Sequence, residues 1–498
     1  MKKVIIIGSG LGGLTAGNLL AKRGYAVTLF ESHSAPGGYT AGFHRKGYYF
    51  ESGALSLESS ASVFKAMQDI GVLEQLDFVR QRMRYVSADY DAIPENFLEY
   101  KKMLYEAFPD EKAKLDRVLA ELEEMADALS GMDGPIPNLL EGFAKLKAML
   151  PYLWKGPKLL KVAKRYGEMT SSEYAARYFE KGSKLYNFFG NTFYPDMPAM
   201  LLGAVAGMFT DYWTVRSGMQ AWADVLAENF RKLGGALILS SYVDKIITRD
   251  GAAVGVMSKE AFHQADYVIA AGDYKKTFLQ LIDDKSLIPR ELVKKVESAA
   301  VSEGVFTVYL GLNIANAELE KYLKIPHVLL DNSSPGYDIY DAADAEYFTK
   351  APLTMYAPSL VNPRHAPEGK SSLMLMTTVP YHWLNNWGGG DKEIYKELKA
   401  KAAQALIRTA STLVPSLEEK IDFQDAATPL TYERYTHNTD GATSAWSWNP
   451  QKRFHKTIIE AHIDTPVRNL FIGSCWAIQI GGIPGALIAA YECVRKIK

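Results

Sequence analysis

Three glycines near the N-terminus have the spacing of a phosphate-binding turn. They form a GxGxxG pattern between the β-branched run 4–7 and the apolar-faced segment 14–24. In a strand–turn–helix unit of this kind, main-chain N–H groups approach a pyrophosphate, and the helix N-terminus adds partial positive charge. The pattern therefore predicts a dinucleotide site, with candidate contacts from Gly8, Ser9, Gly10, Leu11, Gly12 and Gly13.

An acidic residue ends the next predicted strand, 26–30. Glu31 lies at the distance from the glycine turn where a carboxylate accepts hydrogen bonds from both hydroxyls of an adenosine ribose. Its negative charge would repel a 2′-phosphate, so the residue disfavours NADP. A glycine-rich helix start without a ligand is the alternative interpretation. Strand, helix and acid occur together, and this combination favours the dinucleotide.

Three further segments contain residues suited to the same ligand. A glycine pair and Tyr39 follow the acid and precede a predicted hairpin at 43–53. A predicted strand at 469–472 leads into a glycine and a serine, and a glycine-rich turn then begins the last helix. In the middle of the chain, 242–247 and 253–256 are predicted strands joined by an Asp-Gly turn.

These segments resemble the flavin-dependent amine oxidase and phytoene desaturase superfamily, in which the paired glycines approach the pyrophosphate and ribityl chain of FAD. The resemblance implies FAD as the cofactor, without a separate nicotinamide domain. Tyr39 stands where the family has an arginine, and Ser474 stands where it has an acid. The further contacts that the resemblance implies are Gly37, Gly38, Tyr39, Val243, Gly473, Ser474, Gly482 and Ile483.

The resemblance also implies the architecture. We expect an α/β fold with a Rossmann-type FAD-binding domain, glutathione reductase-like and carrying a small antiparallel sheet. An inserted α+β substrate domain should interrupt it. The expected cofactor domain comprises 1–70, 205–290 and 420–498, and the expected substrate or cap domain comprises 71–204 and 291–419.

Two stretches of the sequence indicate which activity within the superfamily is expected. Residues 356–370 and 427–435 are similar to stretches of carotenoid desaturases, carotenoid isomerases and retinol saturases. We therefore expect an FAD-dependent oxidoreductase that desaturates, saturates or isomerises a carotenoid-, retinoid- or isoprenoid-like polyene. It would need an unidentified electron donor or acceptor. The alternatives are a flavin amine oxidase of the same fold and a non-catalytic flavoprotein that binds a lipid or a partner.

No catalytic acid or base can be assigned from the sequence. The candidates are Asp273, Arg45, Glu51, Arg434 and His437, and most have a structural explanation. Asp273 is expected to cap a turn or helix. Arg45 and Glu51 are expected to pair across the hairpin, and His437 is expected in a loop.

Composition excludes several classes of protein. The 498 residues include 56 basic and 57 acidic ones, and this balance does not favour nucleic acid. Only two cysteines are present, Cys475 and Cys493, so a disulfide framework and a multi-cysteine metal site are excluded. The nine histidines form no HExxH motif, and we predict no metal. A reducing, cytoplasmic location is the expectation.

The segment 142–167 is both basic and apolar. Pro151 and Gly156-Pro157 predict short, broken helices. A basic amphipathic surface with a tryptophan suits an anionic membrane, which would make the protein peripheral at the inner face of the membrane. A solvated outer face of the cap is the alternative. The sequence contains no apolar run of about 20 residues, so it predicts no membrane-spanning helix.

Overall fold

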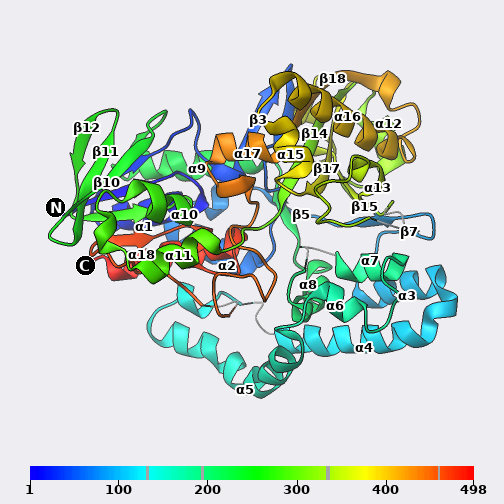
Figure 1. The fold of residues 1–498 in the computed structure, drawn as a ribbon, viewed down its shortest axis with the longest axis horizontal. Coiled ribbons are helices and arrows are strands. Elements are labelled where there is room, and N and C mark those ends of the chain that lie inside the picture. The colour runs from blue at the N-terminus through cyan, green and yellow to red at the C-terminus, as the bar shows by residue number, and fades with distance from the viewer. Residues whose placement is uncertain (131–133, 192–193, 195, 333–336, 458–459) are drawn as a thin grey trace.

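The structure is a computed structural model that describes residues 1–130, 134–191, 194, 196–332, 337–457 and 460–498. Figure 1 shows both chain termini in one lobe, at the left of the view. The upper right lobe is built on a large sheet, and a group of helices lies below that sheet. Among the described residues, none of the helices combines the length and the apolar character needed to cross a membrane.

The left lobe is built on a parallel five-stranded sheet. Its order is β19 (Leu470–Ile472), β13 (Tyr267–Ala270), β1 (Lys3–Ile7), β2 (Ala26–Phe30) and β9 (Ala236–Ile238). The chain leaves β1 for β2 on one side, and β13 and β19 later add on the other side. Ligands of such sheets bind beyond the carboxyl ends of the strands, where the strand order reverses. That place is next to β1.

Three long helices cover this sheet, and a small antiparallel sheet adjoins it. The helix α1 (Leu11–Lys22) packs against both α9 (Met219–Lys232) and α18 (Gly482–Lys496). The small sheet consists of β10 (Val243–Arg249), β11 (Ala252–Ser258) and β12 (Ala261–Gln264). The parallel sheet and the small antiparallel sheet confirm the predicted Rossmann-type fold class.

The upper right lobe contains a seven-stranded sheet. Its order is β18 (Ile421–Ala427), β14 (Gly304–Leu312), β17 (Ser371–Val379), β16 (Leu353–Tyr356), β15 (His327–Leu330), β6 (Arg84–Val86) and β7 (Asp91–Ala92). The range 420–498 was predicted in the cofactor domain, but β18 pairs with β14 across this sheet. The rest of the predicted domain division stays a prediction.

The helices at the bottom and lower right of Figure 1 include one that differs from the prediction. They are α3 (Phe97–Ala107), α4 (Lys112–Leu129), α5 (Gly142–Tyr166), α6 (Ser171–Ala175), α7 (Lys184–Gly190) and α8 (Val205–Met208). The prediction of short, broken helices is wrong, because α5 continues through Pro151 and Pro157. A proline inside a helix costs about 3 kcal/mol. Ion pairs to α4 and the burial of Val162 and Tyr166 hold α5 in place beyond its prolines.

The remaining elements connect these units. They are α2 (Ser60–Ile70), α10 (Tyr274–Lys276), α11 (Arg290–Ser298), α12 (Asn316–Leu323), α13 (Tyr347–Lys350), α14 (Pro358–Val361), the left-handed turn α15 (Trp383–Gly389), α16 (Lys392–Ser411), α17 (Pro429–Thr436), and the strands β3 (Gly42–Arg45), β4 (Tyr48–Glu51), β5 (Phe78–Arg80) and β8 (Trp213–Val215).

Candidate functional site

The turn between β1 and α1 leaves little room except on one side. A Cβ atom on Gly13 would lie 2.0 Å from the carbonyl oxygen of Gly8, and one on Gly12 would lie 2.3 Å from that of Gly473. A Cβ atom on Gly10 would meet nothing within 4 Å. Gly10 also precedes α1 without a side-chain cap, and the first turn of α1 contains no acid. The open side of this turn therefore suits an anion held by main-chain N–H groups.

Glu31 lies at the end of β2 with four hydrogen-bond donors around its carboxylate. One oxygen accepts bonds from the N–H and the hydroxyl of Ser9, at 2.8 and 2.7 Å. The other oxygen accepts the N–H of His33 at 2.8 Å and the hydroxyl of Ser32 at 3.1 Å. The two N–H donors belong to the main chain and fix the carboxylate, whereas the two hydroxyls can rotate away. Two ribose hydroxyls can replace them.

The paired glycines lie against the same turn. Gly37 donates its N–H to the carbonyl oxygen of Ser9 at 3.0 Å. A Cβ atom on Gly38, whose φ is +57°, would lie 3.2 Å from the Cα atom of Gly10. The close approach requires glycine at this position. It also leaves main chain, without side chains, beside the open face of Gly10.

Tyr39, which stands where the family has an arginine, directs its side chain toward the other lobe. Its hydroxyl donates to the carbonyl oxygen of Gly441 at 2.9 Å, and its ring stacks on Tyr432 at 5.9 Å between centroids. Burial is the main cause that raises the pKa of the Tyr39 phenol, so the side chain stays neutral. The tyrosine therefore joins the two lobes through its aromatic ring.

The C-terminal segment meets the N-terminal turn at the carboxyl ends of β13 and β19. The hydroxyl of Ser474 donates to the carbonyl oxygen of Gly272 at 2.7 Å, and Ser474 is buried. Gly481 precedes α18 without a side-chain cap, and α18 begins with Gly482 and Ile483. The uncapped N-termini of α1 and α18 therefore both lie at this edge of the sheet, where their partial positive charge favours an anion.

Val243 begins β10 and is buried beside this edge. Two residues earlier, Ser241 donates its N–H to the main-chain oxygen of Glu31 at 2.7 Å. The chain that leads into β10 thus passes the end of β2, next to the carboxylate. Segments from all predicted parts of the cofactor domain meet here, and their arrangement fits an extended dinucleotide such as FAD.

Glu51 has a structural partner other than the predicted one. Its carboxylate accepts the hydroxyl of Tyr49 at 2.7 Å and the N–H of Met219, the first residue of α9, at 3.1 Å. Burial raises the pKa of Glu51 to about 8. The predicted pair with Arg45 is wrong, because the register of the hairpin sets Glu51 opposite Gly42 and leaves Arg45 exposed.

The other predicted acids and bases also have local roles. Asp273 caps α10 by accepting the N–H of Lys276 at 2.7 Å, and its other oxygen accepts the N–H of Thr439 at 2.6 Å. This confirms the expected helix cap. His437 ends α17 with a φ of +57°, in the loop that was expected. Arg434 is exposed beside the ring of Tyr435.

The structure brings together two carboxyl groups that sequence reasoning missed. The side chain of Glu58 is solvent-accessible, yet burial is the main cause that raises its pKa. Burial also raises the pKa of Glu303, which accepts the hydroxyl of Thr443 at 3.0 Å. Both carboxyls therefore release their protons at a higher pH than an ordinary glutamic acid does.

Tyr194 connects the two carboxyls to the cofactor edge. Its pKa is raised to about 12 by burial, and the charges of Glu58, Glu303 and Cys475 add to this effect. Its ring stacks on Trp448 with centroids 4.9 Å apart. Cys475 directly follows Ser474, so Tyr194 lies near the predicted flavin contacts. No motif in the sequence marks these residues, because their spacing is long and irregular.

Comparisons with known proteins agree on the family. A profile of the family "Flavin containing amine oxidoreductase" matches residues 11–498. All-trans-retinol 13,14-reductase of Danio rerio is 21% identical over 531 aligned positions, which cover 98% of this chain and 84% of the reductase. A 4,4′-diapophytoene desaturase of a Methylomonas species is 23% identical, over 99% of this chain and 94% of the desaturase.

A solved structure shares the fold. Cyclohexylamine oxidase from Brevibacterium oxydans IH-35A superposes with a TM-score of 0.64 and 12% identity, over 99% of this chain and 98% of the oxidase. The family match extends from residue 11 to residue 498, which is nearly the whole chain. The chain therefore belongs to the flavin containing amine oxidoreductase family and is an FAD-dependent oxidoreductase.

Proposed function

We propose that this oxidoreductase acts on the C=C or C–C bonds of a lipophilic polyene, by desaturation, saturation or isomerisation. The observation that carries the proposal is the stacked pair Tyr194 and Trp448 close to the predicted cofactor edge. The charges of Glu58 and Glu303 act on the phenol of Tyr194, and burial raises the pKa of both carboxyls, which favours their uncharged forms. An aromatic surface suits an apolar ligand. Two relatives that align over nearly the whole chain are named for retinol and diapophytoene.

The FAD contacts proposed here are those predicted from the sequence. They are Gly8, Ser9, Gly10, Leu11, Gly12, Gly13, Glu31, Gly37, Gly38, Tyr39, Val243, Gly473, Ser474, Gly482 and Ile483. Bound FAD supplies a hydride acceptor or donor at its N5 atom. The N-terminus of α1 would hold the pyrophosphate, Glu31 the ribose, and the N-terminus of α18 the negative charge of the flavin ring.

Glu58 and Glu303 are the proposed proton-handling residues. Because burial raises the pKa of each carboxyl, each keeps its proton to a higher pH than an ordinary glutamic acid and is suited to act as a general acid. Saturating a double bond needs a proton besides the hydride, and desaturation releases one. Apolar and aromatic neighbours would exclude water from the reacting carbons.

An amine oxidase is the main rival. Cyclohexylamine oxidase has the same fold, but 12% identity supports nothing beyond the fold. An amine oxidase would produce peroxide when supplied with an amine. A non-catalytic flavoprotein is the other rival, and its bound flavin would resist both reduction and lipid-dependent reoxidation.

The test uses the purified, flavin-loaded protein under anaerobic conditions. The flavin is reduced chemically, and retinol or a carotenoid in mixed vesicles is then added while flavin absorbance is followed. We expect lipid-dependent reoxidation with a saturated product, or flavin reduction by the lipid when the flavin starts oxidised. A Glu303→Gln variant should keep its flavin and lose turnover. Amine-dependent peroxide in a parallel aerobic assay, without any lipid reaction in the anaerobic one, would contradict the proposal.

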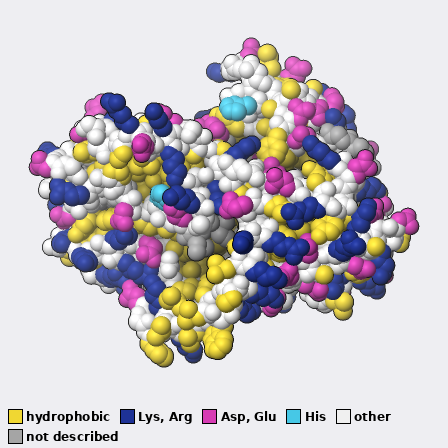
Figure 2. Space-filling model, turned by 60° about the horizontal axis from the view of Figure 1, so that its bottom comes forward, with side chains coloured by type: hydrophobic (Ala, Val, Ile, Leu, Met, Phe, Trp, Pro, Cys, Tyr) yellow, Lys and Arg dark blue, Asp and Glu magenta, His cyan; other side chains and the backbone are white. Residues whose placement is uncertain are grey.

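We also propose that α5 contacts the surface of an anionic membrane from which the substrate enters. Its outer face is strongly apolar, since Phe143, Trp154 and Leu160 are 79%, 85% and 71% exposed. Figure 2 shows hydrophobic side chains gathered on a protruding part of the molecule. Lys147 and Lys164 are exposed on the same helix and can meet lipid phosphates. A cytoplasmic location with peripheral attachment stays part of this proposal.

The basic residues of α5 contribute less to this contact than their number indicates. Lys158 pairs with Asp127 of α4, and Lys161 lies 3.0 Å from Glu124. Arg165 lies 2.6 Å from Glu121. These cations point toward α4 and hold the helix in place. The apolar face, more than the lysines, would therefore determine membrane binding.

A further inference from the structure

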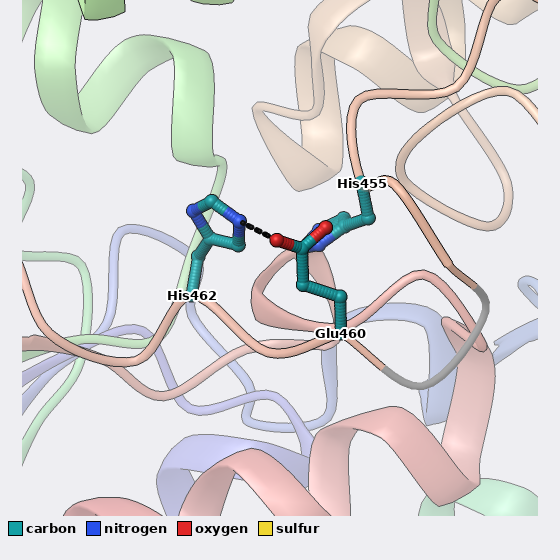
Figure 3. A group of neighbouring side chains, drawn as sticks. All are labelled: His455, Glu460 and His462. Atoms are coloured by element: carbon teal, nitrogen blue, oxygen red, sulfur yellow. Dashed lines mark ion pairs between the residues drawn. The ribbon is translucent and has the colours of Figure 1, made fainter.

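Three side chains that can bind a metal lie together in the segment before β19. Figure 3 shows His455, Glu460 and His462 with their side chains turned toward one another. One donor atom from each lies within 4.8 Å of the other two, a grouping found in the part of the chain that the structure describes. The Nε2 atom of His462 is 3.3 Å from an oxygen of Glu460.

His455 is the unusual member of this group. Its side chain is 1% exposed, and neither of its ring nitrogens has a hydrogen-bond partner among the described residues. An unsatisfied buried polar group costs about 1–3 kcal/mol, so a ring with two such atoms needs an explanation. A neutral imidazole binds a metal ion through a ring nitrogen, which would give this buried side chain the partner it lacks in the described part of the chain.

We propose that His455, Glu460 and His462 bind one Zn²⁺ ion, with a water molecule as the fourth ligand. Imidazole and carboxylate donors suit Zn²⁺, which prefers four ligands in a tetrahedral arrangement. Tetrahedral bonds of about 2.0–2.2 Å set neighbouring donor atoms about 3.3–3.6 Å apart. The pair formed by Glu460 and His462 already has this separation, and His455 has to move inward to complete the site.

The surroundings of the site fix two of the ligands and indicate what the metal does. The second oxygen of Glu460 accepts the N–H of Lys456, which orients the carboxylate. The main-chain N–H of His462 donates to the carbonyl oxygen of Ala477 at 2.7 Å, and Ala461 forms a β-bridge with Ile478. The segment 477–478 leads directly into the glycine turn before α18. A bound metal would therefore fasten this loop to the chain that precedes the flavin turn.

Zn²⁺ binding to the untagged, flavin-loaded protein tests the proposal. After dialysis against a chelator, Zn²⁺ alone is titrated by calorimetry, and bound metal is counted by elemental analysis. We expect one Zn²⁺ per chain and a higher Tm in its presence. His455→Gln and His462→Gln should each weaken binding at least tenfold. His382→Gln is the matched control, because His382 is exposed and lies outside the cluster.

Flavin content shows whether each variant is folded. If His455→Gln loses its flavin, Glu460→Gln and His462→Gln carry the test, because both positions are partly exposed. Loss of Zn²⁺ binding in these folded variants supports the site. The proposal is overturned if the wild type binds no Zn²⁺, or if the cluster variants bind it as well as His382→Gln does. The latter result would mean an adventitious ion only.

Discussion

Ser9 donates both its amide N–H and its hydroxyl to one oxygen of Glu31, which links the glycine turn to the end of the neighbouring strand. The amide bond holds the carboxylate at a fixed place beside the start of α1. The hydroxyl bond can be exchanged for one from a ribose. The protein thereby keeps a buried acid satisfied and still able to bind the cofactor.

Replacing Glu31 should weaken FAD binding. Glu31→Ala removes two charge-assisted acceptors, each worth at most about 1.5–3 kcal/mol, so affinity should fall about tenfold or more. Titration of FAD into the flavin-free protein measures the change. Ser32→Ala is the control, because it removes only a hydroxyl that a ribose would displace, and it should bind as the wild type does. Equal affinity for Glu31→Ala would show that the adenosine lies elsewhere.

Restoring the family's acid at Ser474 should also weaken FAD binding. The Ser474 hydroxyl donates to the carbonyl oxygen of Gly272, and an ionised aspartate cannot. Its carboxylate would also lie near Asp273, which is buried and already bonded to Thr439. A buried carboxylate without donors costs several kcal/mol. The affinity of Ser474→Asp for FAD gives the size of this cost, and tighter binding would contradict the expectation.

Combining Ser474→Asp with Tyr39→Arg tests whether the two departures from the family pattern belong together. The Cys475 thiol adds to the raised pKa of Tyr39, so this segment and Tyr39 are close enough to interact. We expect the arginine to recover binding that the aspartate loses. A double-mutant cycle on FAD affinity measures the coupling. Additive effects, within about 0.5 kcal/mol, would mean that the two positions are independent.

Glu51 should make the protein less stable as pH rises. Its pKa is raised from 4.5 to about 8 in the folded protein, so the folded state holds a proton that the unfolded state releases between these values. The stability that this proton contributes is complete below pH 4.5 and is lost as pH rises through 8. Each pKa unit corresponds to about 1.4 kcal/mol, which sets an upper limit of about 5 kcal/mol.

Glu51→Gln keeps the shape of the protonated acid and should remove this pH dependence. Denaturant unfolding at several pH values from about 5 to 9 compares the variant with the wild type. Glu397→Gln, at an exposed position of α16, is the control and should follow the wild type. Parallel stability curves for Glu51→Gln and the wild type would show that Glu51 is ionised in the folded protein.

The apolar face of α5 should determine membrane binding. Replacing Phe143, Leu153, Trp154 and Leu160 by serine removes side chains that are each at least 66% exposed. Burying one such side chain contributes about 1.5–3 kcal/mol, so binding to anionic vesicles should fall at least tenfold. Cosedimentation measures it, and flavin content should not change. Leu98→Ser is the control, since Leu98 is 71% exposed on α3.

Replacing cations of α5 should have a different effect. Lys158→Gln and Lys161→Gln break pairs with α4, so they should loosen the helix and change vesicle binding little. A wild-type protein that never binds vesicles at low salt would favour the solvated-face interpretation. Equal binding by the serine variant and the wild type would exclude the apolar face as the contact.

The sequence by itself determined the start of the cofactor site. The glycine turn and Glu31 lie in one strand–helix–strand unit, where backbone geometry permits few residue types at each place. The cap at Asp273 was predictable for the same reason, because its partner Lys276 is three residues away. The geometry of a turn or a helix cap depends on residues that are close in sequence. Such features can therefore be predicted without knowledge of the rest of the molecule.

Only the tertiary structure decided the features that depend on distant partners. Strand β18 joins the seven-stranded sheet because β14 offers it an edge, and α5 stays continuous because α4 supplies acids along its length. The carboxylate of Glu51 accepts the first N–H of α9, at Met219, and the charges of Glu58 and Glu303 both act on Tyr194. Burial and long-range packing set these contacts and the pKa values that follow from them. Long-range contacts of this kind leave no periodic or closely spaced pattern in the sequence.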